Sequence, residues 1–141
     1  MSEFIDNSIG YWIAKLKNKM KRQMSDNLKV YDLTPEQRSI LIILFDEGAM
    51  SQREIGELKS MEPSNLTVTL RRLVDKDYIT KSKHPTDTRA YLVELTEKAK
   101  KICPQLKDLS VQVSGNLLKG ISENNLETTL ASIKKMINNI D

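Results

Sequence analysis

Residues 64–75 can place hydrogen-bonding side chains along one face of a helix. At about 100° per residue, Leu66, Leu70 and Leu73 fall on a common apolar face, and we expect Val74 to be buried beside them. The opposite face carries short polar side chains and then arginines: Ser64, Asn65, Thr67, Val68, Arg71 and Arg72. Short side chains let a helix enter a major groove, and arginines reach guanine edges or phosphates. This face therefore indicates recognition of double-stranded DNA. Val68, near its centre, either contacts a thymine methyl group or is a surface valine without a role.

A polar, basic hairpin follows this segment. Residues 78–83 and 90–96 favour strands, because side chains of the second segment alternate with a period of two, and the loop between them holds turn-forming residues. The side chains that this wing offers to DNA are Lys81, Lys83, His84, Asp87 and Arg89. Residues 71–90 hold six basic and three acidic residues, whereas the whole chain has a net charge of only +3. The local excess is either a solvated surface or the electrostatic footprint of a DNA-binding face.

Helices must hold the polar helix face and the wing in place. Thr34 and Gln37 form a capping box around Pro35, and Gly48 is suited to end the helix that they begin. The apolar run at 40–45 indicates that this helix is buried.

A second capping box, Ser51 with Glu54, opens a short helix that we expect to bury Ile55 and Leu58. The helix with the polar face starts near residue 62 and runs to about residue 76. Two helices with so short a connection predict a helix-turn-helix.

Both ends of the chain are predicted to be helical, with one apolar side. A first helix over residues 3–29 carries an apolar stripe, and a last helix, capped by Ser122 after Gly120, repeats apolar residues at steps of four and three. Nothing else in the chain clearly covers both stripes, so a homodimer is the economical solution. The expected dimerisation residues are Ile9, Ile102, Leu106, Leu126, Leu130, Ile133 and Ile137.

The expected fold class is mainly α with a small β-hairpin: a winged helix-turn-helix with N- and C-terminal dimerisation helices. Residues 1–30 and 98–141 would form the dimerisation region, and residues 31–97 the DNA-binding domain.

Composition argues against other classes. One cysteine and one histidine argue against a disulfide framework, a multi-thiolate zinc site and Ser-His-Asp chemistry. Paired carboxylates in an apolar setting, a glycine-rich phosphate loop and a nucleophile with a base partner are also missing from the sequence, so we expect no enzyme, cofactor or metal. No window approaches the ~20 apolar residues of a membrane span, and no signal-peptide pattern opens the chain, which favours a cytoplasmic protein without membrane contact.

Four segments together resemble the MarR family of bacterial and archaeal transcription regulators: residues 66–76, 77–79, 85–90 and 93–99. They match the family's order of recognition helix, strand, wing with Asp-x-Arg, and Leu-Thr-Glu-Lys before a long helix. The resemblance implies a homodimeric regulator, typically a repressor, that binds a pseudo-palindromic operator. It also implies possible release by a small aromatic or phenolic effector.

Residue roles follow from this resemblance. Asp87 looks like the aspartate that orients the guanidinium of Arg89, which enters the minor groove. Ser51 and Gln52 match a place where the family contacts phosphate, at a helix N-terminus. The turn that reads bases in the family corresponds to Ser64, Asn65, Thr67 and Val68.

Three positions depart from the family pattern. Asp77 stands where glycine is usual, although aspartate tolerates a left-handed backbone better than most residues. Val68 stands where many members have arginine, which leaves the base preference open. Lys59 stands where an apolar residue is common, so the preceding helix is expected to end differently.

Sensor residues have two interpretations each. Cys103, near Lys100 and Lys101, is either an inert packing residue or a redox centre. Tyr11 and Trp12 belong to the core or line an effector pocket with the second helix. His84 is a solvated wing residue or contacts phosphate. For the whole chain, the alternative to a DNA-binding regulator is a winged-helix module that binds only proteins.

Overall fold

The protein is described here by a computed structural model, which describes residues 1–140; Asp141, the last residue of the expected dimerisation region, lies outside it. Seven α-helices and three strands follow one another in these residues. Their order is α1 (Glu3–Asp6), α2 (Ile9–Leu28), the 3₁₀ turn η1 (Lys29–Tyr31), α3 (Pro35–Glu47), β1 (Met50–Ser51), α4 (Gln52–Lys59), α5 (Pro63–Asp75), β2 (Ile79–Lys83), β3 (Tyr91–Leu95), α6 (Glu97–Leu117) and α7 (Glu123–Asn138). The expected fold class, mainly helical with a small β-hairpin, is confirmed.

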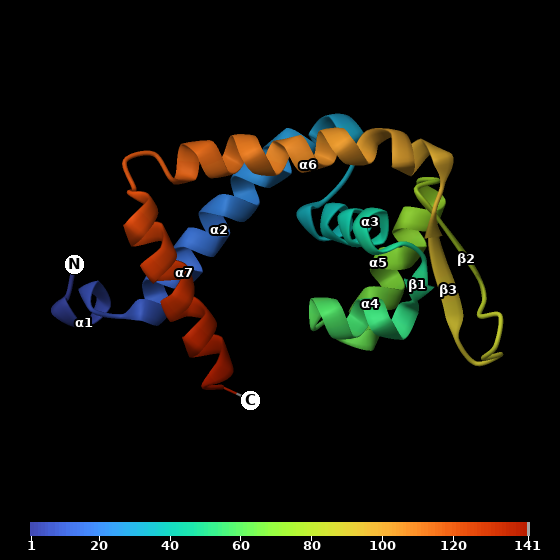
Figure 1. Ribbon diagram of the computed structural model, residues 1–141, viewed down its shortest axis with the longest axis horizontal. Coiled ribbons are helices and arrows are strands. Elements are labelled where there is room, and N and C mark those ends of the chain that lie inside the picture. Colours follow the sequence, from blue (N-terminus) through green and yellow to red (C-terminus); the bar gives the residue numbers. More distant parts are fainter. Residues whose placement is uncertain (141) are drawn as a thin grey trace.

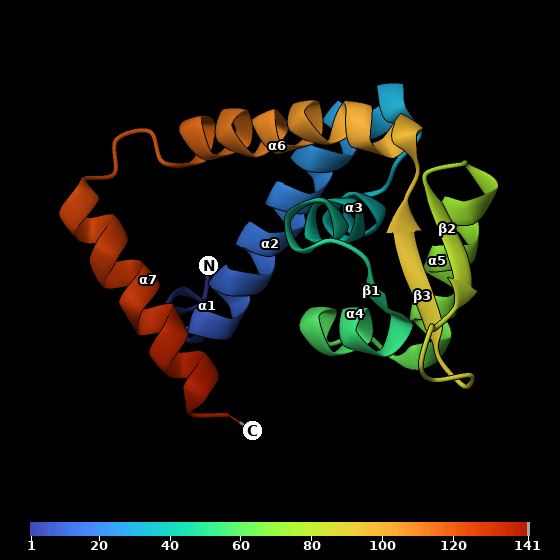
Figure 2. The same ribbon diagram turned by 45° about the vertical axis from the view of Figure 1, so that its right-hand side comes forward.

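The molecule has a compact lobe and an open limb that consists of the helices α2, α6 and α7 (Figure 1). The lobe consists of α3, α4, α5 and the sheet, and the long α6 runs from the end of β3 across to α7. The N-terminal half of α2 lies at the far end, near α7, in both views (Figures 1 and 2). Among the described residues, no helix is long and apolar enough to cross a lipid bilayer.

The expected capping residues begin their helices. Thr34 and Gln37 exchange side-chain and backbone hydrogen bonds at the start of α3, and Ser51 and Glu54 do so at α4. Gly48 follows α3 with a φ of 85°, a conformation that suits glycine. Asp77 has a φ of 60°, so it takes the left-handed conformation expected of the residue in place of the family's glycine.

The sheet is antiparallel in the order β1-β3-β2. β2 and β3 are the predicted hairpin, with Ile79 opposite Leu95 and Lys83 opposite Tyr91. The two-residue strand β1 was not predicted, because two residues are too few to display a period. Met50 pairs with Val93, so β1 joins the residues before α4 to the wing.

One core joins the helices of the lobe to the limb. Leu28 of α2 and Leu41 of α3 are fully buried in the same cluster as Leu70 of α5 and Val93 of β3. Arg38 strengthens the contact between α3 and α6, because its guanidinium donates two hydrogen bonds to the Leu106 carbonyl at 3.0 and 2.8 Å. Burial lowers the pKa of Arg38 from its usual value, but arginine remains charged.

The structure corrects one of the expected dimerisation residues, Leu106, and places a second, Ile102, partly against the same core. Leu106 has no exposed surface even in the single chain, and Ile102 is half-buried against the same core. Both project from the first half of α6, which packs on α3 and β3. Their apolar spacing therefore reports the core of one chain, which helical periodicity alone does not distinguish from a contact between chains.

Three further expectations about the helices are wrong. The helix predicted over residues 3–29 is interrupted, because the Ser8 side chain accepts a hydrogen bond from the Tyr11 N–H and starts α2 anew. Leu58, expected to be buried, is 62% exposed, and Val74 is 39% exposed. Ile55 and Leu73, on the same two helices, are fully buried.

Candidate nucleic-acid interface

The exposed face of α5 carries the side chains that the sequence suggested. The buried face consists of Leu66, Leu70 and Leu73, which hold the helix against the lobe. The six side chains proposed for base and phosphate contacts are exposed: Ser64, Asn65, Thr67, Val68, Arg71 and Arg72. The start of α4 and the tip of the wing both lie on the side of the lobe away from α6 (Figures 1 and 2).

The start of α4 is organised by hydrogen bonds within the chain. The Ser51 hydroxyl accepts a hydrogen bond from the Glu54 N–H at 3.1 Å, and the Glu54 carboxylate accepts one from the Ser51 N–H at 2.8 Å. These bonds lower the pKa of Glu54. The Ser51 hydroxyl is therefore already engaged as the helix cap.

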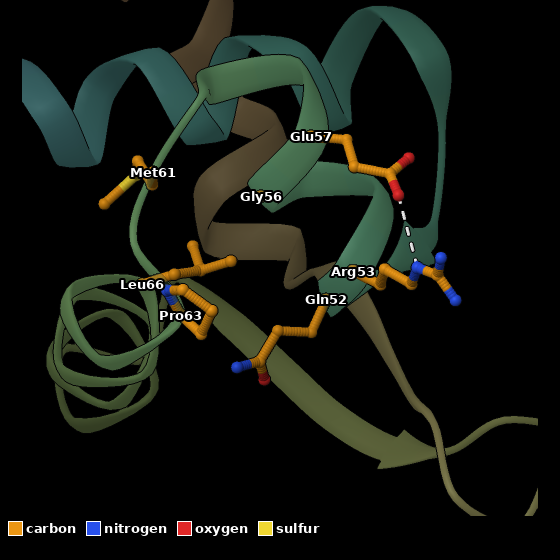
Figure 3. A pocket seen from close by; sticks show the side chains of 7 residues that line it. All are labelled: Gln52, Arg53, Gly56, Glu57, Met61, Pro63 and Leu66. Atoms are coloured by element: carbon orange, nitrogen blue, oxygen red, sulfur yellow. Dashed lines mark hydrogen bonds and ion pairs between the residues drawn. The ribbon is translucent and has the colours of Figure 1, made fainter.

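The Gln52 side chain does not extend freely toward solvent. Its Nε2 donates a hydrogen bond to Thr67 Oγ1 of α5 at 3.1 Å, which links the two helices of the helix-turn-helix. Figure 3 shows Gln52 reaching from the start of α4 toward the start of α5, beside Pro63. Its neighbours Gly56, Met61, Pro63 and Leu66 line a mostly apolar hollow of about 390 Å³.

The wing loop is closed by two side chains that bond to its backbone. His84 Nδ1 accepts hydrogen bonds from the N–H groups of Thr86 and Asp87, both at 3.3 Å. Asp87 Oδ1 accepts a hydrogen bond from the Arg89 N–H at 3.0 Å. Because Nδ1 is the acceptor, this loop requires the histidine tautomer that carries its hydrogen on Nε2.

This geometry corrects the expected role of Asp87. The carboxylate bonds to the backbone of Arg89, and no ion pair joins it to the guanidinium among the described residues. The two-residue spacing produces an Asx turn instead, because the short aspartate side chain reaches the backbone two residues on. Arg89 is an exposed residue, and Asp87 contacts its backbone N–H.

The two lysines of the wing, Lys81 and Lys83, have different surroundings. Lys81 Nζ lies 4.8 Å from the centre of the Tyr91 ring, which lies across the hairpin, and this contact holds the ammonium above an aromatic face. Lys83 is exposed at the end of β2.

A second concave surface lies between the limb and the lobe. It encloses about 590 Å³ and its lining residues come mainly from α2 and α3. They are Ile13, Leu16, Lys17, Met20, Lys21, Met24, Pro35, Glu36, Lys59 and Val113. Tyr11 and Trp12, suggested for such a pocket, are not among them; their rings pack edge to face on each other, 5.1 Å apart.

Two roles were missed in the sequence. Lys59, noted only as an unusual residue, donates a hydrogen bond to Ser39 Oγ at 2.7 Å and forms an ion pair with Glu36 at 3.4 Å, which ties the end of α4 to α3. His84 organises the wing loop, and no spacing rule identifies a side chain that accepts from its own loop. Pro85, immediately after it, and the other turn-forming residues of the loop indicated a tight turn but not the role of His84.

A helix-turn-helix followed by a β-hairpin defines the winged-helix class, which many transcriptional regulators share. The family model of the MarR family matches residues 33–91, which contain the helix-turn-helix and most of the wing. The transcriptional regulator SarZ of Staphylococcus aureus is 26% identical over 116 residues, which are 82% of this chain and 77% of SarZ.

Solved structures of MarR proteins are similar to this chain over nearly its full length. A mutant MarR from E. coli in complex with operator DNA has a TM-score of 0.87 at 26% identity, covering 96% of this chain and 99% of MarR. The apo form of wild-type MarR has a TM-score of 0.74 at 27% identity, covering 92% and 96%. The chain is therefore similar to MarR-family transcriptional regulators across its helix-turn-helix and most of its wing, and to solved MarR structures over nearly its whole length.

Cys103 gives a prediction about redox sensing. Its side chain is fully buried, its Sγ lies 3.8 Å from the Leu41 carbonyl oxygen, and burial raises the pKa of the thiol to about 11. Because thiolate is the reactive form, we expect native protein at pH 8 to react with iodoacetamide at least about a hundredfold more slowly than urea-unfolded protein. Equal rates before and after unfolding would exclude an inert role.

The raised pKa of Cys103 makes the free energy of unfolding depend on pH. Between pH 9 and 11 the unfolded chain loses the Cys103 proton and the native chain keeps it, so stability falls as pH rises. Two pKa units correspond to about 2–3 kcal/mol. Because the raised pKa of Tyr78 lowers the stability of both proteins over this range, urea unfolding of wild type and Cys103→Ala, at one protein concentration, should show an additional loss of this size in wild type.

Proposed function

We propose that the protein is a homodimeric repressor that binds a pseudo-palindromic operator, with α5 in the major groove and the wing in the minor groove. The observation that carries the proposal is the common orientation of the α5 start, the α4 start and the wing tip (Figures 1 and 2). Half-sites would then lie one helical turn apart, at roughly 34–36 Å. Because the hydroxyl and the backbone N–H of Ser51 are both engaged with Glu54, the start of α4 would contact phosphate through the other N–H groups of its first turn.

The comparison with E. coli MarR supports this proposal. Of the two MarR structures described above, the one with operator DNA has the higher TM-score against this chain. The described arrangement of limb and lobe therefore resembles a DNA-bound form of a relative. An in vitro selection from random DNA duplexes tests the function directly: recovery of an inverted repeat supports it, and no enrichment favours the protein-binding alternative.

The dimer is supported by apolar side chains that the single chain leaves uncovered. On α2 this is Ile9, and on α7 they are Leu130, Ile133 and Ile137. Ile137 is 64% exposed, although it belongs to a continuous apolar stripe. Such patches mark interaction surfaces, and a second copy of the chain would cover them. We assign residues 1–30 and 98–141 to dimerisation and residues 31–97 to DNA binding, with Leu28 and the first half of α6 as shared core.

The cleft of about 590 Å³ between limb and lobe has the size of a small-molecule site. Its floor is apolar, with Leu16, Met20 and Val113, and Lys17 and Lys21 add positive charge. These features suit a small aromatic anion, such as an aromatic carboxylate. An effector bound there would touch both α2 and α3 and could change the position of the lobe relative to the limb.

For the wing, we expect Arg89→Ala to weaken binding to every selected operator. The salt dependence should fall by about one phosphate equivalent per wing, hence about two per dimer. Lys101→Ala, on α6 and away from the proposed DNA side, is the control for lost charge. Unchanged affinity and salt slope in Arg89→Ala would exclude a wing contact.

Asp87 gives a separate test of loop geometry. Asp87→Asn keeps an oxygen that can accept from the Arg89 N–H, whereas Asp87→Ala does not. We expect Asp87→Asn to bind like wild type and Asp87→Ala to bind several-fold more weakly, by loss of about one hydrogen bond. Equal losses in the two variants, measured by the same titration, would instead indicate ion pairing with the guanidinium.

For the dimer, Ile133→Glu should place an uncompensated charge in the interface and give monomeric or unfolded protein at micromolar concentration. Thr128→Glu is the matched control on α7, because residue 128 lies on the opposite side of the helix from residue 133. Light scattering with circular dichroism measures both. A monomeric wild type would contradict the proposal.

Benzoate and phenol test whether the cleft recognises the negative charge of an effector or only its aromatic ring. Benzoate should release DNA from wild type, and Lys17→Gln combined with Lys21→Gln should raise the required benzoate concentration about threefold or more. Phenol, which is neutral, should act on both proteins equally. Failure of both compounds to release DNA would count against an aromatic effector in this cleft.

A further inference from the structure

Gln52 and Thr67 form a hydrogen-bonded pair between the two helices of the helix-turn-helix. Gln52 was expected to contact phosphate, but its Nε2 donates to Thr67 Oγ1 at 3.1 Å. Gln52 Oε1 is buried and has no hydrogen-bond partner among the described residues. The contact with Thr67 is thus the one hydrogen bond that the described structure gives to this side-chain amide.

The Thr67 hydroxyl is occupied from two sides. Its hydrogen is donated to the Pro63 carbonyl oxygen, one helical turn earlier, at 2.9 Å. A threonine hydroxyl has one hydrogen and two lone pairs, so the Gln52 amide leaves one lone pair free. The side chain remains exposed on the face of α5 proposed to enter the major groove.

The two bonds define what Thr67 can offer to a base. It can accept one hydrogen bond and present a methyl group, but its hydrogen is already used. In the major groove, adenine N6 and cytosine N4 are donors, whereas guanine and the polar group of thymine present acceptors there. A threonine held in this state pairs with adenine or cytosine and not with guanine or thymine.

We infer that Gln52 is a specificity-determining positioning residue, which acts through Thr67 to select an amino-bearing base at one position of each half-site. This inference rests on the proposed function, because it requires α5 to lie in the major groove. Without the Gln52 amide, the Thr67 hydroxyl loses one of the two bonds that hold its side chain in this rotamer, and its free lone pair is no longer fixed toward the base. The preference for an amino-bearing base should then weaken.

The experiment uses the full-length dimer and an operator obtained by selection from random duplexes. Thr67→Val removes the hydroxyl at nearly constant shape, and the base position whose preference changes is the one that Thr67 contacts. Four duplexes that differ only at that position in each half-site are then titrated with each protein. We expect wild type to bind the adenine and cytosine duplexes about three- to tenfold more tightly than the other two, the range of one hydrogen bond.

Two substitutions of Gln52 separate donor loss from other effects. Gln52→Met keeps the length of the side chain without a donor, and the four affinities should converge to within about twofold. Gln52→Glu accepts the Thr67 hydrogen and leaves the hydroxyl an acceptor, so the base ratio should persist while overall affinity falls through charge repulsion. Gln105→Met is the matched control, because the amide of Gln105, on α6 and away from α5, accepts a hydrogen bond from the Tyr31 hydroxyl at 3.0 Å.

The outcomes are distinct. The double variant Gln52→Met with Thr67→Val should show the same base ratios as Thr67→Val alone, since the two residues act as one unit. Equal loss of affinity for all four duplexes in Gln52→Met would overturn the inference and indicate a phosphate contact or a purely structural role. Failure of wild type to enrich any duplex would instead reject the proposed function. Thermal unfolding of each variant verifies that the compared proteins are folded.

Discussion

The short pairing of β1 with β3 is the constraint on which the candidate interface depends. Met50 lies opposite Val93 and Ser51 opposite Leu92, so the residue that caps α4 is also part of the sheet that carries the wing. The start of α4 and the wing are thereby connected through backbone hydrogen bonds rather than through a flexible loop. The leucine face of α5 then packs beneath them, with Leu66 and Leu70 in the common core. Elements that are distant in sequence keep one relative position because of this two-residue strand.

Local sequence rules predicted the helices well where the deciding contacts are local. Capping boxes at Thr34 and Ser51 depend on residues three positions apart, and both are present as expected. The hairpin follows from alternation and turn chemistry over adjacent residues. β1 follows from neither, because its pairing partner lies more than forty residues away and the strand is too short to show a period.

Apolar spacing was less informative about which surface a residue serves. Leu106 and Ile133 both fit an apolar repeat, yet Leu106 is fully buried within one chain whereas Ile133 remains 37% exposed. The difference arises because the first half of α6 packs on α3 and β3, while α7 lies in the open limb (Figure 1). Periodicity gives the direction of a side chain relative to its helix, but the partner of that face depends on the fold of the whole chain.

Polar side chains in the candidate interface show why their functions could be only partly predicted. The exposed positions on α5 followed from helical geometry, but the engagement of each group did not. Asp87 bonds to backbone, the Ser51 hydroxyl caps a helix, and the Gln52 amide binds Thr67. A polar group that is already bonded within the chain offers a ligand only its remaining donors or acceptors. The chemistry available to a DNA base is consequently set by these internal bonds as much as by the residue types, and a recognition face must be evaluated after its own hydrogen bonds have been assigned.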